Sequence, residues 1–552
     1  MGRETWVRRL ARLGLLSLLI GLVASPAASL PKSRDGLSRG LLRFSQSVQL
    51  HYYLAHLDLA PAPLRERLAA LSLAAARAHE GAFGAALGPS APPLGDRFNR
   101  DGAGLPQNEE SVAVCSDRPN IVLSGTNDYR GLIDPDGNFT GWHFSTDGGN
   151  SVKNEGLLPP VDVLGAARPS GGDPVMVAGP GCDFLYGAGL AFDPVDPFAG
   201  SNGIGVYRST PNLLTNCPGG PDPACWPVRR AVATTPPGHF LDKEWIDVGV
   251  SGEAGTVVWV VFADFDIDPN APLGFTSASV MAVQCNEDLS VCTDPILISG
   301  GDPDVQFADV TIGPDGRTYV TWSEIQGELE GTAQTFVHKL RVAPAGGTEF
   351  GPTQIIATET LAIPFGGFLH ANGFRVATYP KHEVRMVGGV PRIYVLWDAC
   401  RFRPLDFICE EPMIKLRYSD DDGASWSRTI VLSAGGDNYF PAIADDPNGN
   451  RLAVAWFTNR FDTLFHNRQD VELVSLNPRT LEVLRRQRIT APSNETEADP
   501  ILGGFFIGDY IEVAVNEGIA YVGYNANYRT IELLGEGRPI PQQDNYLTKR
   551  EL

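Results

Sequence analysis

Short apolar runs, rich in β-branched residues and separated by turn residues, recur along the chain from about residue 96. Each unit combines a short strand, a turn and a second strand that ends in polar residues. Alternation of this kind predicts half-buried β-strands. The first strands of the units are expected at 111–114, 174–177, 245–248, 309–312, 375–377, 442–444 and 510–513.

The spacing of these runs predicts the fold class. Anchors at positions 112, 175, 246, 310, 376, 443 and 511 are separated by 63, 71, 64, 66, 67 and 68 residues. A repeat of this length leaves room for four strands, which is typical of a β-propeller. We therefore expect an all-β propeller of seven four-stranded blades; six or eight blades are also compatible, because weak units are easily miscounted. The last unit has only 42 residues, so 98–110 is expected to supply its outer strand.

The beginning of the chain has a different pattern. Four arginines precede an apolar run at 13–24 and small residues up to Ser29, which predicts a signal peptide over 1–29. Elsewhere no apolar run reaches 18 residues, so no membrane span is expected after cleavage. Leu and Ala at spacings of three and four predict short helices within 41–87, and 88–95 is a Pro/Gly-rich linker. The expected division is a signal peptide (1–29), a helical extension with its linker (30–95) and the propeller (96–552).

Charge and cysteine content narrow the functional classes. The net charge of −21 argues against a nucleic-acid partner. Eight cysteines are typical of an oxidising compartment, so we expect a secreted, periplasmic or extracellular monomer. Metal ligation is the alternative use of the cysteines, but no C-x-x-C spacing occurs. The disulfide pairs favoured by proximity are Cys217 with Cys225, Cys285 with Cys292 and Cys400 with Cys409, which leaves Cys115 for Cys182.

Two turn sequences carry a resemblance to a known family. Residues 419–426 fit S-x-D-x-G-x-x-W, and 145–152 fit it with Val in place of Trp. In such a turn Ser and Asp bond backbone amides and Gly takes a positive φ. The pattern resembles the Asp-box (BNR repeat) of sialidases and sialidase-like propellers, over about 96–552. The resemblance implies that each box joins the third and fourth strands of a blade, far from catalysis, with structural roles for Ser145, Asp147, Gly149, Ser419, Asp421, Gly423 and Trp426.

A ligand site is expected at one end of the central channel, where the loops that enter the first strands meet. Carboxylates precede the first strand in six of seven units. The same residues also make turns and caps, so each one alone is weak evidence. A carboxylate ring could hold Ca²⁺, although no compact calcium loop is present and no cofactor is required. The carboxylates are Glu109, Glu110, Asp173, Asp242, Glu244, Asp302, Asp304, Asp437 and Asp509.

The resemblance also implies catalytic candidates. Sialidases use three arginines on the sugar carboxylate, an aspartate as acid/base and a Tyr–Glu nucleophile pair. By position, the arginine candidates here are Arg130, Arg401, Arg460 and Arg529, the acid/base is Asp128 and the nucleophile is Tyr510. The chain departs from the family in two ways. It lacks F-R-I-P in the first unit, with a partial echo at 374–376 in the fifth, and it has seven units where sialidases have six blades.

These patterns leave two functional hypotheses. The first is a binding propeller that holds a glycan, or a cell-surface or extracellular protein, at the acidic and Arg-rich end of the channel. The alternative is a glycoside hydrolase of sialidase type that cleaves terminal acidic sugars. The missing F-R-I-P sequence favours binding.

Overall fold

The computed structural model describes residues 40–60, 62, 64–66, 68–69, 71–72, 97–100, 105–327, 334–361, 367–369, 372, 374–401, 408–499, 502, 506–531 and 540–552. The predicted signal peptide and the linker at 88–95 lie outside the described residues. The side chains of Arg401, Cys409 and Arg529 are also outside the description, although their backbones lie in strands.

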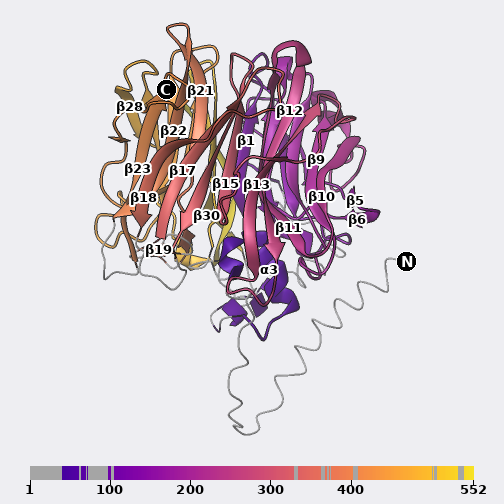
Figure 1. Ribbon diagram of the computed structural model, residues 1–552. Helices are drawn as coiled ribbons and strands as arrows, with labels where there is room; N and C mark the ends of the chain where they lie inside the picture. Colours follow the sequence, from indigo (N-terminus) through magenta and orange to yellow (C-terminus); the bar gives the residue numbers. More distant parts are fainter. Residues whose placement is uncertain are drawn as a thin grey trace, which may run out of the picture.

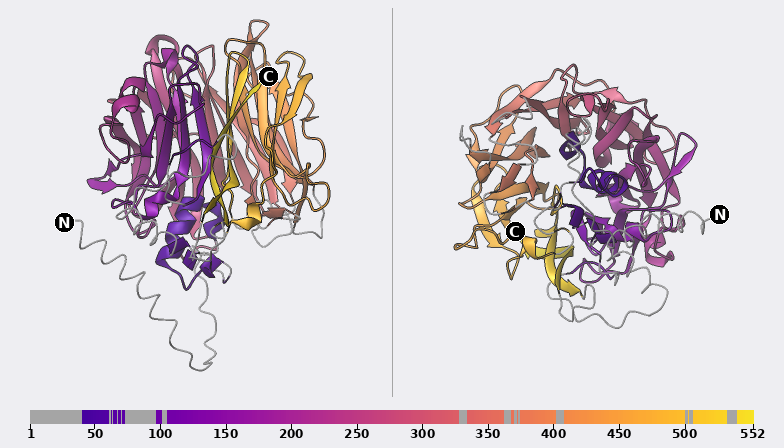
Figure 2. Two further views of the ribbon diagram at one scale, coloured as in Figure 1. Left: turned by 180° about the vertical axis from the view of Figure 1, so that it is seen from behind. Right: turned by 90° about the horizontal axis from the view of Figure 1, so that it is seen from below.

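Seven antiparallel sheets stand around a central channel, as the ribbon seen from below shows (Figure 2). In six of them the strand next to the channel is followed outward by three more. This arrangement confirms the predicted seven-bladed propeller. The first three blades contain β1 (Gln107–Val114), β2 (Val122–Asp128), β3 (Thr140–Ser145), β4 (Asn154–Leu157); β7 (Val175–Ala178), β8 (Leu185–Ala191), β9 (Asn202–Ser209), β10 (Val228–Thr235); and β11 (His239–Val250), β12 (Thr256–Ile267), β13 (Phe275–Asn286), β14 (Ile296–Leu297).

The remaining blades follow in chain order around the ring (Figure 1). They contain β15 (Val305–Ile312), β16 (Thr318–Gln326), β17 (Gln334–Ala343), β18 (Gln354–Leu361); β21 (Lys381–Val387), β22 (Val390–Arg401), β23 (Ile408–Ser419), β24 (Ile430–Val431); β25 (Asn438–Asp445), β26 (Leu452–Thr458), β27 (Asp470–Leu476), β28 (Val483–Arg488); and β29 (Glu512–Asn516), β30 (Ile519–Ile531), β31 (Ile540–Glu551).

Short elements connect these strands. The fifth sheet carries the additional strands β19 (Gly367–Leu369) and β20 (Arg375–Val376), and a two-stranded hairpin is formed by β5 (Val161–Val163) and β6 (Ala166–Arg168). The helices are η2 (Leu41–Arg43), α3 (Gln46–Ala55), η3 (Tyr129–Leu132), η4 (Pro180–Cys182), α5 (Pro211–Asn216), η5 (Gly252–Ala254) and η6 (Thr496–Ala498).

The seventh blade is completed from the other end of the propeller sequence. Its three strands β29–β31 are joined by Arg97, which forms an antiparallel bridge with Tyr546. The amide of Phe98 donates to the carbonyl of Asn545 at 2.9 Å, and the Asn545 side chain donates back to the carbonyl of Phe98 at 3.1 Å. The expected outer strand therefore begins one residue earlier than predicted, and 107–114 instead forms β1 of the first blade.

The prediction for the fifth unit was wrong. Residues 375–376 form β20, which pairs with β19, and the channel strand of that blade is β21. Asp309 accepts the amide of His382, as Glu512 accepts the amide of Val112 and Ser111 that of Met176. His382 therefore occupies the position in the fifth blade that Val112 holds in the first. Counted from His382, the turn at Ser419 begins 37 residues on, close to the 33 residues between Val112 and Ser145.

A bulge recurs in the channel strands at one level. The pairing register shifts in β1, β11, β15 and β25, and one bulged residue in each has a positive φ. A non-glycine residue in this region of φ is strained, and the surrounding structure must hold it there. At the bulge of the third blade, Lys243 Nζ donates to Asp509 Oδ2 at 2.8 Å. The residues with positive φ are Glu109 (59°), Lys243 (54°), Phe307 (59°) and Phe440 (53°), and Asp173 (54°) lies just before β7.

Large side chains fill the spaces between neighbouring blades. One tryptophan from each of the first six blades is fully buried, and four of the six lie in second strands. The six are Trp142, Trp226, Trp259, Trp322, Trp397 and Trp456. The second blade's tryptophan follows α5 rather than a second strand, and it packs edge-on against Trp142 at 6.1 Å between ring centroids.

The two S-x-D-x-G turns lie between third and fourth strands, β3 with β4 and β23 with β24. In the first, Ser145 Oγ donates to Asp147 at 2.7 Å and accepts the amide of Gly149 at 3.0 Å. In the second, Ser419 Oγ makes the same two bonds with Asp421 and Gly423, at 2.8 and 2.9 Å. The side chain of Trp426 packs at the edge of a hydrophobic cluster.

Three of the predicted disulfides are present: Cys115–Cys182, Cys217–Cys225 and Cys285–Cys292. Cys400 is disulfide-bonded too, and its predicted partner Cys409 lies among the side chains outside the description. The first bridge joins neighbouring blades, because Cys115 follows β1 and Cys182 ends η4.

Candidate functional site

The end of the channel where the seven first strands begin is covered by the N-terminal segment that contains η2 and α3. This lower end is the bottom of Figure 1, and the view from below shows the indigo helices across the middle of the ring (Figure 2). Ser45 donates its amide to Asp242 Oδ2 at 2.8 Å, and Arg375 Nη1 donates to the carbonyl of Phe44 at 2.9 Å. The predicted ligand-binding end is therefore occupied by the chain itself.

A buried group of ionisable side chains lies beneath this segment; we call it the charged cluster. Asp509 is its centre: Arg375 Nε donates to Oδ1 at 2.8 Å, Arg375 Nη2 contacts Oδ2, and Lys243 Nζ donates to Oδ2 at 2.8 Å. Another member, Glu109, accepts the amide of Asp509 at 3.1 Å. The charged cluster consists of Glu109, Asp173, Asp242, Lys243, Arg375 and Asp509.

Burial and pairing divide the carboxylates of this cluster into two kinds. Burial acts to raise the pKa of Asp509, but Arg375 and Lys243 outweigh it and lower that pKa to about 2. Burial raises the pKa of Asp173 to about 7, although Lys243 opposes the shift. It also raises the pKa values of Asp242 and Glu109. Asp509 is thus the permanent anion, and the others hold protons more readily.

Three of the catalytic candidates have well-defined surroundings near the lower end. Asp128 ends β2 and is fully buried. Its carboxylate accepts Arg130 Nε at 2.9 and 3.0 Å and Gln107 Nε2 at 3.0 Å. Tyr510 is buried and donates its hydroxyl to the carbonyl of Pro174 at 2.9 Å. Burial also raises the pKa of Tyr510 well above its usual value, which does not suit a nucleophilic phenolate.

The remaining arginine candidates occupy separate blades. Arg460, which follows β26, forms an ion pair with the fully buried Glu472 and lies over the ring of Phe461 at 4.2 Å. Arg401 ends β22 and Arg529 lies in β30, but their side chains are outside the description. Arg130 and Arg460, the two whose side chains are described, are thus each paired with a carboxylate of their own blade.

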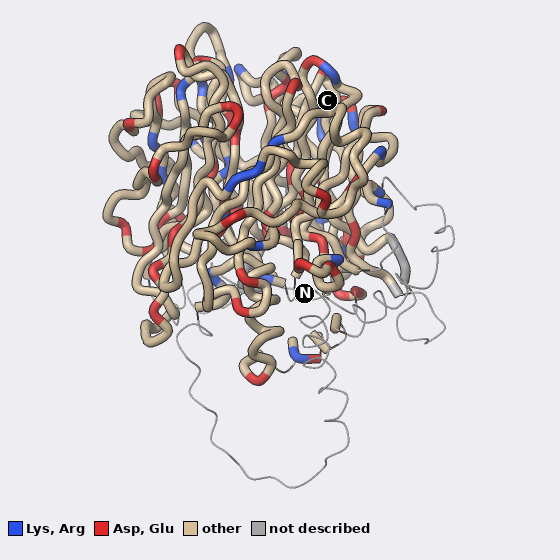
Figure 3. Tube along the Cα trace, turned by 90° about the vertical axis from the view of Figure 1, so that its right-hand side faces the viewer, with Lys and Arg blue, Asp and Glu red and all other residues tan. Residues whose placement is uncertain are grey.

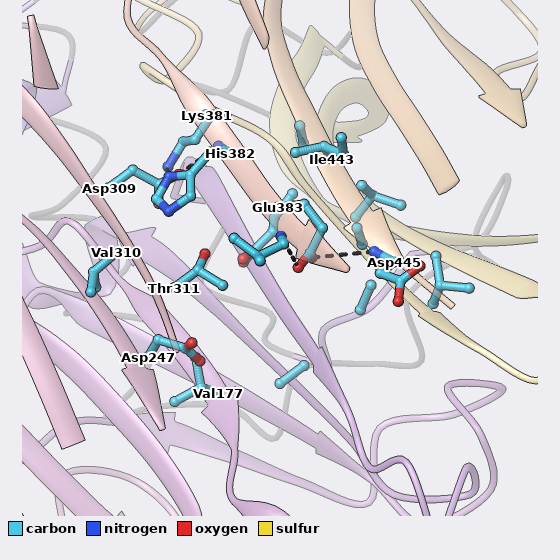
Figure 4. A pocket seen from close by; sticks show the side chains of 18 of the residues that line it. Val177, Asp247, Asp309, Val310, Thr311, Lys381, His382, Glu383, Ile443 and Asp445 are labelled. Carbon is cyan, nitrogen blue, oxygen red and sulfur yellow. Dashed lines mark hydrogen bonds and ion pairs between the residues drawn. The ribbon is translucent and has the colours of Figure 1, made fainter. Parts of the chain in front are cut away.

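The opposite half of the channel holds a cavity of about 630 Å³, which we call the upper cavity (Figure 4). It is lined by the later parts of the first strands. Residues at its floor, such as Asp309 and Lys381, are buried, whereas Asp445 and Arg385 near the strand ends are half-buried. Its ionisable lining residues are Asp247, Asp309, Lys381, His382, Glu383, Arg385, Asp445 and Glu512.

The lysine and arginine side chains of the upper cavity, and the His382 ring beside them, each have a carboxylate neighbour among the described residues. Lys381 lies 3.8 Å and His382 3.0 Å from Asp309, and Arg385 is paired with Asp445. The amide of His382 also donates to Asp309 at 2.8 Å. These contacts link the channel strands of the fourth, fifth and sixth blades, β15, β21 and β25.

Other carboxylates of the cavity tie one blade to the next. Asp247 Oδ2 accepts the amide of Ile312 at 2.6 Å, and Glu383 Oε2 accepts that of Asp445 at 3.2 Å. Glu512 Oε2 accepts the amide of Val112 at 2.8 Å and thereby joins the last blade to the first. These bonds are made by backbone groups that a channel strand cannot satisfy within its own sheet.

Burial moves several pKa values of the upper cavity toward neutrality. It raises the pKa of Asp247 to about 6, that of Glu512 to about 7 and, together with Asp445, that of Glu383 to about 8. Burial lowers the pKa of Lys381 to about 8, although Asp309 and Glu512 oppose this shift. The charge of the cavity therefore becomes more negative between about pH 6 and 8.

A narrow septum separates the upper cavity from the charged cluster. On one side it is aromatic: the rings of Phe307 and Tyr379 stack at 5.0 Å, and those of Tyr379 and Phe440 at 6.3 Å. Trp245, half-buried, contacts both Tyr510 and the ammonium group of Lys381. A small cavity of about 30 Å³ lies among these residues.

Acidic and basic residues are interspersed along the strands and loops of the ring (Figure 3). Across the part of the chain that the structure describes, no group of three or more His, Cys, Asp or Glu side chains is placed to hold a metal ion. Among the same residues, no helix combines the length and apolar character needed to cross a membrane.

Sequence reasoning missed several residues of these two regions. Arg375 was noted only as part of a partial echo of F-R-I-P, yet it lies at the centre of the charged cluster. Lys243 was not singled out, because no pattern reveals the bulge that turns it inward. The carboxylates of the upper cavity had a visible signal: Asp247, Asp309 and Glu512 each interrupt an otherwise apolar strand.

No protein-family model matches the chain, and no curated protein matches it in sequence. Among solved structures it is similar to the Hadza microbial sialidase Hz136 at 12% identity, with a TM-score of 0.41 and 73% of each chain covered. It is similar to the α-L-arabinofuranosidase Arb93A of Fusarium graminearum at 10% identity, with a TM-score of 0.38 and coverage of 84% of this chain and 98% of the other. A PL25 ulvan lyase matches at 8% identity, with a TM-score of 0.37 and coverage of 84% and 96%.

Proposed function

We propose that the protein is an exported binding propeller that holds a short glycan, neutral or bearing an amino group, in its upper cavity. The volume of about 630 Å³ lies within the usual range of small-molecule sites. The lining offers carboxylate acceptors for hydroxyl groups, apolar strand residues, and the half-buried Trp245 at the floor for the apolar face of a sugar ring. Export is supported by the disulfides.

The choice of a neutral or amino sugar as the ligand rests on the carboxylate neighbours that the basic side chains of the cavity already have. Lys381 and His382 are held by Asp309, and Arg385 is held by Asp445. A sugar carboxylate would have to displace one of these partners and would also face the carboxylate of Asp247, which costs free energy at neutral pH. An acidic sugar is therefore disfavoured, and with it sialidase activity at this site.

The test is calorimetric titration of the mature protein with a panel of neutral, amino and sialylated oligosaccharides. We expect binding of neutral or amino glycans and none of the sialylated ones. Thr311 faces the upper cavity (Figure 4), so Thr311→Tyr should fill it and weaken binding at least tenfold. The matched control is Thr358→Tyr, at an exposed position of the outer strand β18, which should leave affinity unchanged.

Hydrolysis of a fluorogenic sialoside tests the alternative function. The wild type is expected to give no turnover. Turnover that is lost in an Arg460→Ala and Arg529→Ala double variant would instead establish a sialidase and overturn the proposal. Glycan binding that Thr311→Tyr leaves intact would place the ligand outside the upper cavity and overturn it as well.

A further inference from the structure

At the covered end of the channel the chain leaves η2 at Arg43 and continues through two residues in an extended conformation, as a bound peptide would be held. Phe44 has φ −88° and ψ 160°, and Ser45 has φ −59° and ψ 158°, between η2 and α3. An extended stretch between two helices leaves its own backbone groups without helical partners. The surrounding blades supply those partners.

Each of the three residues contacts a different part of the ring through polar groups. Arg43 Nη2 donates to Asp304 Oδ2 at 2.8 Å, just before the fourth blade. The carbonyl of Phe44 accepts Arg375 Nη1 before the fifth blade, and the amide of Ser45 donates to Asp242 of the third. Contacts that converge from three blades fix both the position and the direction of the tripeptide.

The Phe44 side chain fills an aromatic pocket. Its ring lies 4.6 to 6.2 Å from four other rings, two of them nearly perpendicular neighbours on the third blade. Both Phe44 and Arg43 are buried, at 0% and 1% exposure. Burying an aromatic ring and a paired guanidinium together is typical of the anchors of a peptide interface. The four rings are those of Phe198, Phe240, Phe265 and Phe275.

The charged cluster beneath retains acceptor capacity. Among the described residues, Asp173 Oδ1, Asp242 Oδ1 and Asp304 Oδ1 are buried and have no hydrogen-bond partner. Buried acceptors of this kind favour a ligand that brings donors. Arg43 supplies such donors in the structure, because its Nη2 donates to Asp304 Oδ2 at 2.8 Å.

We propose that the lower end of the channel is a binding site for an extended peptide in which an arginine precedes an aromatic residue, and that Arg43-Phe44-Ser45 occupies this site in cis. The segment then acts as a built-in competitor: a partner peptide of the same chemistry binds only when the segment has left. This site is distinct from the upper cavity and does not depend on the proposed glycan.

The test uses the full mature chain with Arg43→Ala and Phe44→Ala together, which removes the cis anchors and leaves the blades unchanged. A labelled hexapeptide with the sequence of residues 42–47 (Leu-Arg-Phe-Ser-Gln-Ser) is titrated in fluorescence anisotropy. We expect saturable binding to the double variant and none to the wild type. A peptide carrying Phe44→Ala should bind at least tenfold more weakly. The matched control is Arg65→Ala in the same segment, whose exposed side chain contacts only the carbonyl of Ala60 among the bonds described.

Two outcomes overturn the proposal. One is a double variant with native near-ultraviolet circular dichroism that does not bind the hexapeptide. The other is binding only of a longer peptide that includes α3, which would show that the contact is core packing of a helix rather than recognition of three residues. If the double variant does not fold, Arg43→Gln replaces it, because it removes the charge that pairs with Asp304 and keeps Phe44. The hexapeptide should then compete with the weakened cis segment, and failure to bind this folded variant would contradict the proposal.

Discussion

The two halves of the central channel are lined by the same kinds of residue but use them differently. In the lower half, Asp509 is paired with Arg375 and Lys243 and is covered by the helical segment. In the upper half, carboxylates such as Asp247 and Glu383 accept backbone amides of the next blade and remain half-buried. The lower half thus holds one buried anion between two cations, whereas the upper half combines ion pairs, such as Asp309 with Lys381, with hydrogen bonds from carboxylates to the backbone amides of the next blade.

The difference teaches where a ligand can enter. In the lower half, protein groups rather than water surround the charged side chains. A buried charge there is stabilised by a fixed partner. In the upper half, the carboxylates that bond the next blade, such as Asp247 and Glu383, are half-buried and still reached by solvent. Two channel regions with similar composition therefore differ in accessibility.

The largest effect is expected when Asp509, the centre of the charged cluster, is removed. Asp509→Ala leaves Arg375 and Lys243 buried without their shared anion, so we expect the free energy of unfolding to fall by about 3–5 kcal/mol. Urea unfolding measures the change. The matched control is Asp420→Ala, which breaks a partly exposed ion pair with Arg392 and should cost no more than about 1 kcal/mol. Equal losses for the two variants would show that the lower half does not depend on its buried charges.

Most of the fold could be predicted from the sequence, because the repeat of apolar runs is a local property of the chain. The seven units and the short last blade follow from spacing alone. The error in the fifth unit has a local cause: Arg375 and Val376 look like a strand, and they are one, but they pair with β19 outside the channel. Arg375 still reaches the charged cluster, but β20 is not the channel strand, which is β21. A strand pattern indicates burial but does not indicate which strand is innermost.

The sites were less accessible to sequence reasoning, because they depend on long-range geometry. Arg375 meets Asp509 across 134 residues, and Lys243 meets it across 266. Which carboxylates face the channel depends on bulges at Glu109 and Lys243 that no residue pattern marks. The predicted end of the channel was rich in charge as expected, but its cover by α3 follows from packing that the helical periodicity of 41–87 does not specify.

The pH dependence of stability offers a more moderate test, directed at the upper half. Burial and Asp445 raise the pKa of Glu383 from 4.5 to about 8, so the folded state favours its neutral form. The stability that this group contributes is complete below about pH 4.5 and is lost as the pH rises toward 8. Glu383→Gln should therefore flatten the decline of stability over this window by at most about 1.4 kcal/mol per pH unit.

Thermal unfolding at a series of pH values measures this change. Because Glu383 is half-buried, solvent screening should keep the observed effect below that limit. Glu482→Gln, on an exposed loop, is the matched control and should leave the profile of the wild type unchanged. A Glu383→Gln profile that coincides with the wild type would mean that the cavity carboxylates remain fully solvated.

The smallest effect is expected in a region that belongs to neither half of the channel. Asp421 accepts the amide of Ser425 at 2.8 Å and the hydroxyl of Ser419 at 2.8 Å in an exposed turn. Asp421→Ala should lower the free energy of unfolding by about 1 kcal/mol, because the turn loses bonds that water partly replaces. Asp147→Ala, in the equivalent turn of the first blade, should cost a similar amount. Glycan affinity in the upper cavity should stay at the wild-type value in both variants, and a loss of affinity in either one would place the ligand at the outer turns instead of in the channel.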